Sequence, residues 1–386
     1  MQHKKTDKNV YMLGLVSLFT DISSQMIYPL LPIFLSSVLG ASTSFIGMLE
    51  GIAESSASIL KGFSGWYSDK LKKRKPIVFC GYSLSTIGKP FLYLATSGWH
   101  VLIIRFIDRV GKGIRTPARD ALISDSSLPG QMGRSFGLQR SMDRIGAFIG
   151  PLAAFAILPL INNNMRLLFF LAFFPALAAV LIIIFFVKEK KHQDTSTPPK
   201  VFSFKHFNKD FKIFVVILGI FTLGNSSDAF LILRAKDLGV KIALIPILWL
   251  MYNFICSVSA MPLGHLSDKI GRRKTTFLGF LVYSVVYLGF AFSNTQNHIW
   301  LFMAIYGIYY GLSEGVLRAY VSDLIEDKSV LATAYGIYNM VVGLCMFPAS
   351  LIMGILWQHF NPTVAFAFGA SLALLSAAGL SLFVRK

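Results

Sequence analysis

The chain has few charged residues and very few cysteines for its length. Only 15% of its 386 residues are Asp, Glu, Lys or Arg, whereas a soluble domain carries about 25%. Together with a hydrophobic share of 54%, this scarcity indicates a membrane protein. The three cysteines, Cys80, Cys256 and Cys345, stand alone inside apolar segments, so we expect neither a disulfide framework nor a cysteine-based zinc site.

Several motifs that carry chemistry are also missing from the sequence. It holds no G-x-x-x-x-G-K-[ST] phosphate loop, which argues against ATP as an energy source. No nucleophile–base pair stands out, so we do not expect an enzyme. The apolar segments lack clustered His, Cys or Asp ligands, so we predict no metal site and no cofactor. None of the seven histidines lies in the middle of an apolar run, so carboxylates must carry any protons that cross the membrane.

Twelve apolar stretches are long enough to cross a bilayer, which takes about 20 residues per helix. They are residues 10–39, 44–67, 76–96, 98–118, 134–160, 163–187, 211–238, 242–263, 275–293, 298–322, 333–357 and 361–384. We see no short alternating segments of the kind that form barrel strands. The sequence therefore predicts an all-α polytopic membrane protein. The first stretch is too long for a signal-peptide core, and we interpret it as a span of the mature protein.

The excess of positive charge predicts how the chain lies in the membrane. Lys and Arg number 37 against 19 Asp and Glu, and the formal net charge is +18. The basic residues gather in KLKKRK at 70–75, in segment 188–210 and in KIGRRK at 269–274, and the connections between these are almost free of them. The positive-inside rule places the basic connections, and both termini, in the cytoplasm, for a multi-pass inner-membrane protein. Because the charge lies between apolar runs, we do not expect nucleic acid as a partner.

The two halves of the chain repeat one another. GWYSDKLKKRK at 65–75 returns as GHLSDKIGRRK at 264–274, and DALISD at 120–125 returns as RAYVSD at 318–323. Polar segment 188–210 separates six spans from the other six. We therefore predict an N-terminal bundle of residues 1–187, a cytoplasmic linker of residues 188–210 and a C-terminal bundle of residues 211–386.

With these repeats the chain resembles the major facilitator superfamily over essentially its whole length. The loop G-x-x-S-D-K-x-x-x-R-K, present twice, is the best-known signature of that superfamily. The resemblance implies twelve transmembrane helices in two pseudo-symmetric six-helix bundles, and a secondary active transporter that works by alternating access. It also implies that the two loops form a conformational latch, although they could serve only to anchor the topology. The predicted latch residues are Gly65, Asp69, Arg74, Gly264, Asp268 and Arg272.

Charged side chains interrupt the fourth apolar stretch at RFIDRVGKGIR, residues 105–115. A charge at the bilayer centre costs about 2.5 to 3.5 kcal/mol or more, so such residues usually face a polar cavity. Arg105, Arg109 and Lys112 follow at steps of four and three and share one helical face. Bases outnumber acids across the apolar spans, which favours a cavity for an anion. Internal ion pairs are the alternative, and Lys89 could extend to a surface instead.

The resemblance places a central cavity between the first, fourth, seventh and tenth spans, and each of these carries polar residues. Buried carboxylates favour binding a proton when a neighbouring cation leaves them, which suggests a simple coupling mechanism. The basic stripe also resembles a degenerate R-x-x-Q-G-x-G motif, in which we favour Arg105 for the proton-linked role. The predicted substrate-binding residues are Gln25, Tyr28, Arg105, Arg109, Asn225, Arg234, Asn253, Tyr310 and Arg318. The predicted proton-coupling residues are Asp21, Asp108, Asp228 and Glu314.

These features predict a proton-coupled transporter of a small anionic or zwitterionic organic solute, such as a carboxylate or a metal chelate. We expect it to act as a monomer in the lipid bilayer. The alternative is a broad-specificity drug/proton antiporter, because GAFIGP at 146–151 resembles an antiporter motif and favours export. Gly146-x-x-x-Gly150 is also an ordinary helix-packing motif. A receptor or a lipid flippase is disfavoured, since the sequence shows no substantial soluble module.

Overall fold

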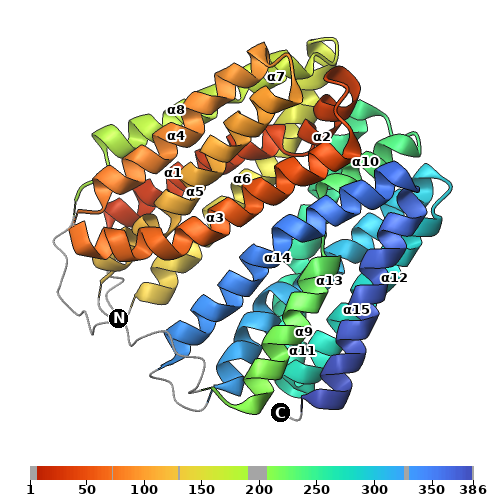
Figure 1. Ribbon diagram of the computed structural model, residues 1–386. Coiled ribbons are helices and arrows are strands. Elements are labelled where there is room, and N and C mark those ends of the chain that lie inside the picture. Colours follow the sequence, from red (N-terminus) through yellow and green to blue (C-terminus); the bar gives the residue numbers. More distant parts are fainter. Residues whose placement is uncertain (1–6, 72, 129–130, 190–206, 326–329, 385–386) are drawn as a thin grey trace. The chain divides into compact units, whose positions relative to one another are not determined.

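The computed structural model describes residues 7–71, 73–128, 131–189, 207–325 and 330–384 (Figure 1). Every regular element within these ranges is a helix, which confirms the predicted all-α class. The first half contains α1 (Lys8–Ile27), α2 (Leu31–Ile33), η1 (Phe34–Val38), α3 (Thr43–Leu71), α4 (Lys75–Leu94), α5 (Gly98–Ser126), α6 (Met132–Leu160), α7 (Met165–Leu171) and α8 (Phe173–Phe185). The second half contains α9 (Lys209–Gly224), α10 (Ala229–Asp237), η3 (Ile242–Leu244), α11 (Ile245–Ile270), α12 (Arg272–Phe292), α13 (Gln296–Leu324), α14 (Leu331–His359) and α15 (Pro362–Phe383).

Joined across their interruptions, these helices correspond to the twelve predicted spans. Within the described ranges, eight stretches are long and apolar enough to cross a membrane by length and composition alone. They are Lys8–Val38, Met132–Leu160, Met165–Phe185, Lys209–Asp237, Ile242–Ile270, Arg272–Phe292, Thr333–His359 and Pro362–Phe383. The spans formed by α3, α4, α5 and α13 are not among them. These four helices also carry many of the charged residues predicted to line a cavity.

Two predicted spans are broken inside the chain. The first span is interrupted after Ile27 by a turn. The turn is followed by the short helix α2, which has a proline in its first turn, and then by the π-helix η1. The seventh stops at Gly224 and starts again at Ala229, so that Asn225 to Asp228 lie outside helical structure. Broken helices at membrane depth are tolerated where they line a cavity or are buried in protein. Both breaks occur next to residues predicted to bind substrate.

The signature segments are mostly helical rather than looped. Helix α3 continues to Leu71 and α4 begins at Lys75, so only residues 72 to 74 join them. A single residue, Gly271, separates α11 from α12. Its φ of 92° lies in the left-handed region, where glycine meets no steric penalty. In the second segment the predicted loop is therefore a single-residue connection between two helices.

The chain divides into two compact units, each described here by itself. Unit 1 comprises residues 1–40, 56–196 and 242–250, and unit 2 comprises residues 41–55, 197–241 and 251–386. In unit 1, α1 packs against α6 and α8, while α4 packs against α5. In unit 2, α12 packs against α13 and α15, and α9 packs against α14 and α15.

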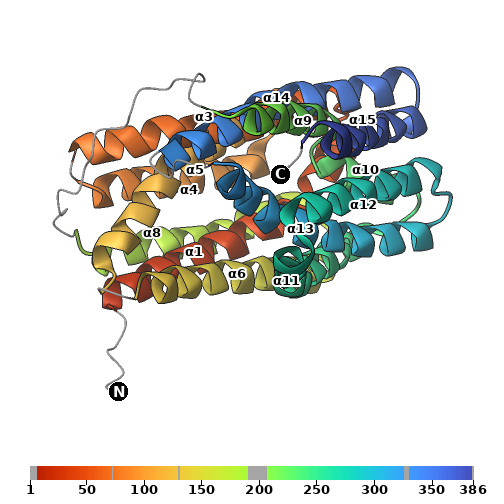
Figure 2. The same cartoon turned by 90° about the horizontal axis from the view of Figure 1, so that it is seen from below.

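Helices α1 and α6 lie side by side in unit 1 (Figure 2). Small residues allow this close approach, because a Cβ on Gly146 would lie 2.6 Å from the carbonyl oxygen of Leu18. A Cβ on Gly150 would lie equally close to the carbonyl oxygen of Ile22. The G-x-x-x-G segment thus serves as a helix-packing face in this structure, as such motifs do in membranes. It also sets the position of Asp21 on α1.

Candidate functional site

Four cationic side chains are buried together in unit 1. Lys89 on α4 is 5% exposed, and Arg105, Arg109 and Arg115 on α5 are 8%, 6% and 7% exposed. On α5, Arg105 and Arg109 are four residues apart and share one helical face. Burying a charge is costly unless it is paired or hydrogen-bonded, so the partners of each determine what this cluster can do. We call these four residues the cationic cluster.

Lys89 reaches from α4 to α1. Its ammonium group donates hydrogen bonds to the hydroxyl of Ser23 and, at 3.4 Å, to the hydroxyl of Ser24. Ser23 in turn donates to the carbonyl oxygen of Ala172. Both hydroxyl partners are neutral, so they satisfy the donors of Lys89 without cancelling its charge. The possibility that Lys89 extends to a surface is wrong, and the two serines of FTDISSQ were the signal that could have placed it inside.

Arg105 lies within a group of residues that the sequence predicted to bind substrate. Its Nη1 is 3.6 Å from Oδ2 of Asp108, one helical turn away. Its guanidinium carbon lies 5.7 Å from the ring centroid of Tyr28, which is a cation–π distance. The Tyr28 ring is 5.1 Å from the ring of Trp249, whose indole N–H donates to Oε1 of Gln25 at 2.8 Å. The structure therefore brings four predicted residues together and adds Trp249.

Arg115 has a different environment from the other members of the cationic cluster. Its guanidinium carbon stands 4.5 Å from the ring centroid of Tyr82, and its Nη1 donates to the hydroxyl of Ser85. Ser85 also donates to the backbone carbonyl of Asp108 at 3.1 Å. These contacts hold α4 against α5, so Arg115 contributes to packing as well as to charge.

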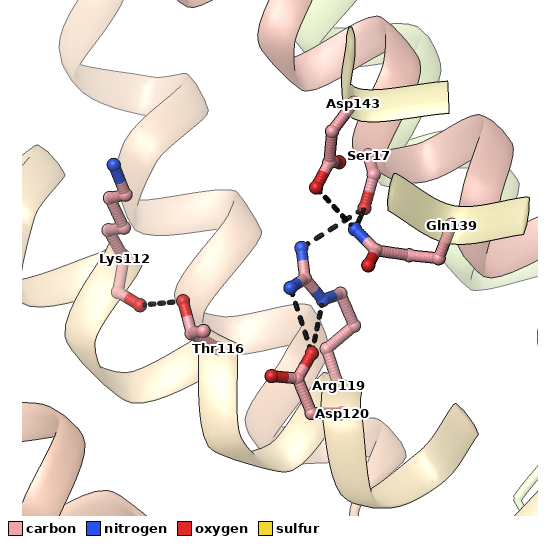
Figure 3. A network of polar contacts seen from close by, with 7 residues as sticks. All are labelled: Ser17, Lys112, Thr116, Arg119, Asp120, Gln139 and Asp143. Carbon is pink, nitrogen blue, oxygen red and sulfur yellow. Dashed lines mark hydrogen bonds and ion pairs between the residues drawn. The ribbon is translucent and has the colours of Figure 1, made fainter. Parts of the chain in front are cut away.

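A polar network connects α1, α5 and α6 near Asp21 (Figure 3). Arg119 donates through Nη1 to Ser17 at 3.1 Å and through Nε and Nη2 to Asp120 at 2.9 and 2.8 Å. Gln139 donates to Ser17 at 3.2 Å and to Asp143 at 2.6 Å. Asp21 itself interacts electrostatically with Asp143 and Arg119, and with Lys112 and Arg115 as well. Sequence reasoning missed Arg119, because it lies beyond the end that we predicted for the fourth span.

In unit 2, acidic residues and tyrosines surround the break between α9 and α10. Asp228 accepts a hydrogen bond from the hydroxyl of Tyr306 at 2.6 Å. The Tyr306 ring stacks on Tyr252 at 5.5 Å and meets Tyr310 edge-on at 5.3 Å. Glu50, only 1% exposed, accepts from the hydroxyl of Ser227 at 3.5 Å. Unit 2 thus buries carboxylates and tyrosines around this break, where the cationic cluster of unit 1 consists of arginines and a lysine.

The remaining predicted residues of unit 2 lie in several places. Asn225 ends α9 at the break. Arg234 donates to the backbone carbonyls of Phe290 at 3.2 Å and Ser293 at 2.7 Å, which ties α10 to the end of α12. Glu314 and Arg318 both lie within electrostatic range of Tyr338. The carbonyl of Asn253 accepts a hydrogen bond from Ser257 inside α11.

Each signature segment forms an ion pair with a carboxylate at the end of another helix. In the first repeat, Nε of Arg74 lies 2.7 Å from Oδ2 of Asp125 at the end of α5. In the second, Nε of Arg272 lies 3.7 Å from Oδ2 of Asp323 at the end of α13, and Arg272 also pairs with Asp268.

Each pair links the start of one helix to the SD sequence at the end of another, although the residue that repeats Arg74 is Arg273 and not Arg272. A Cβ on Gly264 would meet no atom within 4 Å, so close packing does not demand a glycine there. The surroundings of two further predicted latch residues, Gly65 and Asp69, lie outside the described part of the structure.

Among the described residues, no group of three or more His, Cys, Asp or Glu side chains is placed to hold a metal ion. The two buried groups described above offer hydrogen-bond donors, carboxylates and aromatic faces. Such groups can bind and release a charged organic molecule.

Comparisons with known proteins agree on one family. A model of the Major Facilitator Superfamily matches residues 13–350 and, in a second match, residues 213–386. An uncharacterized MFS-type transporter of Methanocaldococcus jannaschii, MJ1317, is 40% identical over 379 residues, which cover 97% of this chain and 94% of that protein. Multidrug resistance protein MdtH of Photorhabdus laumondii is 28% identical over 142 residues, which cover 37% of this chain and 35% of that protein.

Solved structures give the same result for the fold. The crystal structure of the nucleoside transporter NupG superposes with a TM-score of 0.82 at 12% sequence identity, and the match covers 98% of this chain and 99% of that one. At this identity the likeness concerns the fold alone.

Proposed function

Because the chain belongs to the major facilitator superfamily, we propose that it is a proton-coupled secondary transporter for a small zwitterionic or anionic organic solute. The resemblance seen in the signature segments is confirmed by the family match, and the fold by the structural match. The chain is accordingly a membrane transporter rather than an enzyme. The substrate class and the coupling ion are the proposed part.

The observation that carries this proposal is the cationic cluster. Lys89 is hydrogen-bonded to hydroxyl groups, and the guanidinium of Arg105 lies 3.6 Å from the carboxylate of Asp108. Charge-assisted hydrogen bonds from Arg and Lys suit a carboxylate or a phosphate. The cation–π contact with Tyr28 and the hydrogen bond between Trp249 and Gln25 hold the surrounding side chains in place. A substrate anion would bind the ammonium group of Lys89 in place of the neutral hydroxyls of Ser23 and Ser24.

Unit 2 supports the zwitterionic form of the proposal. Asp228 and Glu50 supply negative charge, and the rings of Tyr306, Tyr252 and Tyr310 supply aromatic faces. An organic ammonium group is attracted both to carboxylates and to aromatic faces. Transporters built from repeats place substrate where residues of both halves can contact it. Unit 2 by itself therefore offers partners for the ammonium group of a zwitterionic solute.

Proton coupling is proposed for the carboxylates near these groups. Arg105 lies beside the carboxylate of Asp108 and stabilises its charged form. An anionic substrate that binds Arg105 would weaken this stabilisation and favour protonation of Asp108. Asp228 has a neutral hydrogen-bond donor, Tyr306, which allows it to bind a proton without breaking an ion pair. Asp21 and Glu314 are further candidates. The exchange of a proton for a substrate charge is the coupling step.

We further propose that the chain acts as a monomer in the inner membrane with both termini in the cytoplasm, as the positive-inside rule implies. The N-terminal bundle of residues 1–187, the linker of residues 188–210 and the C-terminal bundle of residues 211–386 are the proposed moving parts. The pairs Arg74–Asp125 and Arg272–Asp323 are the proposed contacts that open and close in the transport cycle.

Broad-specificity drug/proton antiport is a second candidate function. The tyrosine-rich group around Asp228 favours it, since aromatic faces bind lipophilic cations. The match to a multidrug resistance protein covers only part of the chain. The buried lysine and arginines of unit 1 are difficult to reconcile with a cationic drug.

The experiment that separates the two functions is ligand-induced thermal stabilisation of the purified protein. The panel would contain amino acids, dicarboxylates and lipophilic cations, and it would be repeated on Arg105→Gln and on the control Arg134→Gln, which removes an exposed charge of α6. We expect stabilisation by zwitterions or anions in the wild type and in the control, and its loss in Arg105→Gln. Stabilisation by lipophilic cations alone, unchanged in Arg105→Gln, would replace the proposal with drug antiport.

A further inference from the structure

Unit 2 contains a cavity of about 480 Å³ at the corner between α11 and α12. Three consecutive basic residues, Arg272, Arg273 and Lys274, contribute to its lining. Ile270, Phe277 and Leu380 add apolar walls, and Tyr320 and Asp323 complete one side. The cavity shares no lining residue with the buried groups that we propose for substrate binding, although Arg272 and Asp323 also form one of the ion pairs that we propose for the transport cycle.

The basic residues of this cavity differ in how far their charges are neutralised. Arg272 pairs with Asp268 and Asp323. Arg273 donates through Nε and Nη2 to the backbone carbonyls of Leu380 and Ser381 at 3.4 and 2.5 Å, which are neutral acceptors. The side chain of Lys274 is exposed, and among the described residues it forms no hydrogen bond or ion pair. Arg273 and Lys274 therefore keep charge that a ligand can use.

The backbone adds to this positive field. Gly271 precedes α12 and provides no side chain to cap the helix, so the amide groups of its first turn lack a capping side chain. Helix N-termini favour anions, and two cationic side chains lie in this same turn. Asp323 lines the cavity, and Asp210 lies within electrostatic range of Tyr320, so the site is not purely basic. The three cations outnumber the one carboxylate in the lining.

We propose that this cavity binds the phosphate group of an anionic phospholipid. The chemistry is that of a phosphate ester, which either a lipid headgroup or a soluble phosphate could supply. The walls made by Ile270, Phe277 and Leu380 favour a lipid, because a soluble phosphate gains nothing from apolar contacts while an acyl or glycerol group does. Basic pockets between helices on the cytoplasmic side suit such headgroups. The inference rests on the topology proposed above, which places residues 269–274 at the cytoplasmic interface.

The test is lipid binding to the full-length protein, measured by native mass spectrometry in a neutral detergent. Dioleoyl phosphatidylglycerol and dioleoyl phosphatidylcholine would be titrated onto the wild type and onto Arg273→Gln/Lys274→Gln. The matched control is Lys209→Gln/Lys212→Gln, which also removes two positive charges, here from exposed side chains at the start of α9 outside the cavity lining. We expect one site selective for phosphatidylglycerol, weakened about thirty-fold in the double variant and unchanged in the control.

Other outcomes would overturn the proposal. Equal weakening in the control would mean that surface charge attracts the lipid without a defined site. Displacement of the lipid by an equimolar concentration of inorganic phosphate would identify a site for soluble phosphate. Should the double variant fold poorly, Lys274→Gln alone changes an exposed side chain and should weaken binding about five-fold. The assay measures no transport, so its result is independent of whether the proposed substrate class is correct.

Discussion

The packing of α1 on α6 can be tested with one methyl group. In Gly150→Ala the new Cβ would lie 2.6 Å from the carbonyl oxygen of Ile22 and 2.7 Å from Cβ of Gln25. Both contacts involve backbone or the root of a side chain, so α1 must move. Overpacking of this kind costs about 1 to 3 kcal/mol. The matched control is Gly137→Ala on the same helix, where a Cβ would meet no atom within 4 Å.

The two substitutions share the gain in helix propensity, about 1 kcal/mol, which cancels when they are compared. The difference between them is therefore the overpacking cost. At about 2 °C per kcal/mol for a chain of this size, Gly150→Ala should unfold about 2 to 6 °C below Gly137→Ala. The measurement is thermal unfolding of the detergent-purified protein at one protein and detergent concentration. Equal unfolding temperatures would refute the argument that close backbone contact positions Gln25.

Three further predictions concern the buried charges. Lys89→Met should keep the free energy of unfolding within about 1.5 kcal/mol of the wild type, because methionine has a similar volume. It should abolish stabilisation by anions, whereas Lys89→Arg should retain part of it. An unchanged ligand response in Lys89→Met would contradict a role for this cation. Asp228→Asn should flatten the pH dependence of transport in proteoliposomes, and Tyr306→Phe should keep it, so a normal pH profile in the first variant removes Asp228 from the coupling step. Arg74→Gln should destabilise the protein by about 3 to 5 kcal/mol, because the side chains of its ion pair with Asp125 are only 6% and 13% exposed. Arg272→Gln should cost about 0 to 1 kcal/mol, because the side chains of its pair with Asp323 are 24% and 60% exposed. Equal losses of unfolding free energy in chemical denaturation would show that burial does not decide the cost.

Hydrophobic length and repeats allowed most of the fold to be predicted. Spans of about 20 apolar residues determine where helices cross, and the repeated SDK segments identify the two halves. The second break escaped prediction because nothing in FTLGNSSD, residues 221–228, stops a helix as strongly as proline does, whereas Pro29 and Pro32 lie at the first break. Asn225 and its neighbours are weak helix formers, and other helices support the break through hydrogen bonds such as those of Ser227 with Ser350 and of Asp228 with Tyr306.

The candidate site was predicted in part. Helical spacing was enough to place Arg105 beside Asp108, because both lie on one helix. Partners from distant helices cannot be read from spacing, which is why the contacts of Lys89 with Ser23 and Ser24 and of Arg234 with backbone carbonyls were not foreseen. The proton-coupling and substrate-binding assignments stay predictions until the variants above are measured.

The uneven hydropathy of the helices has a consequence for biosynthesis. Helices α3, α4 and α5 follow one another, and none is among the stretches apolar enough to partition into lipid by composition alone. For α5 the translocon would meet Arg105, Asp108 and Arg109 near the middle of one segment, at a cost of about 2.5 to 3.5 kcal/mol for each. Of these charges, Arg105 meets the aromatic ring of Tyr28 only once the segment that follows α1 is in place. We therefore expect the ribosome-bound chain to hold these three helices at the translocon until the apolar α6 has emerged, so that the first bundle enters the membrane as an assembly rather than one helix at a time.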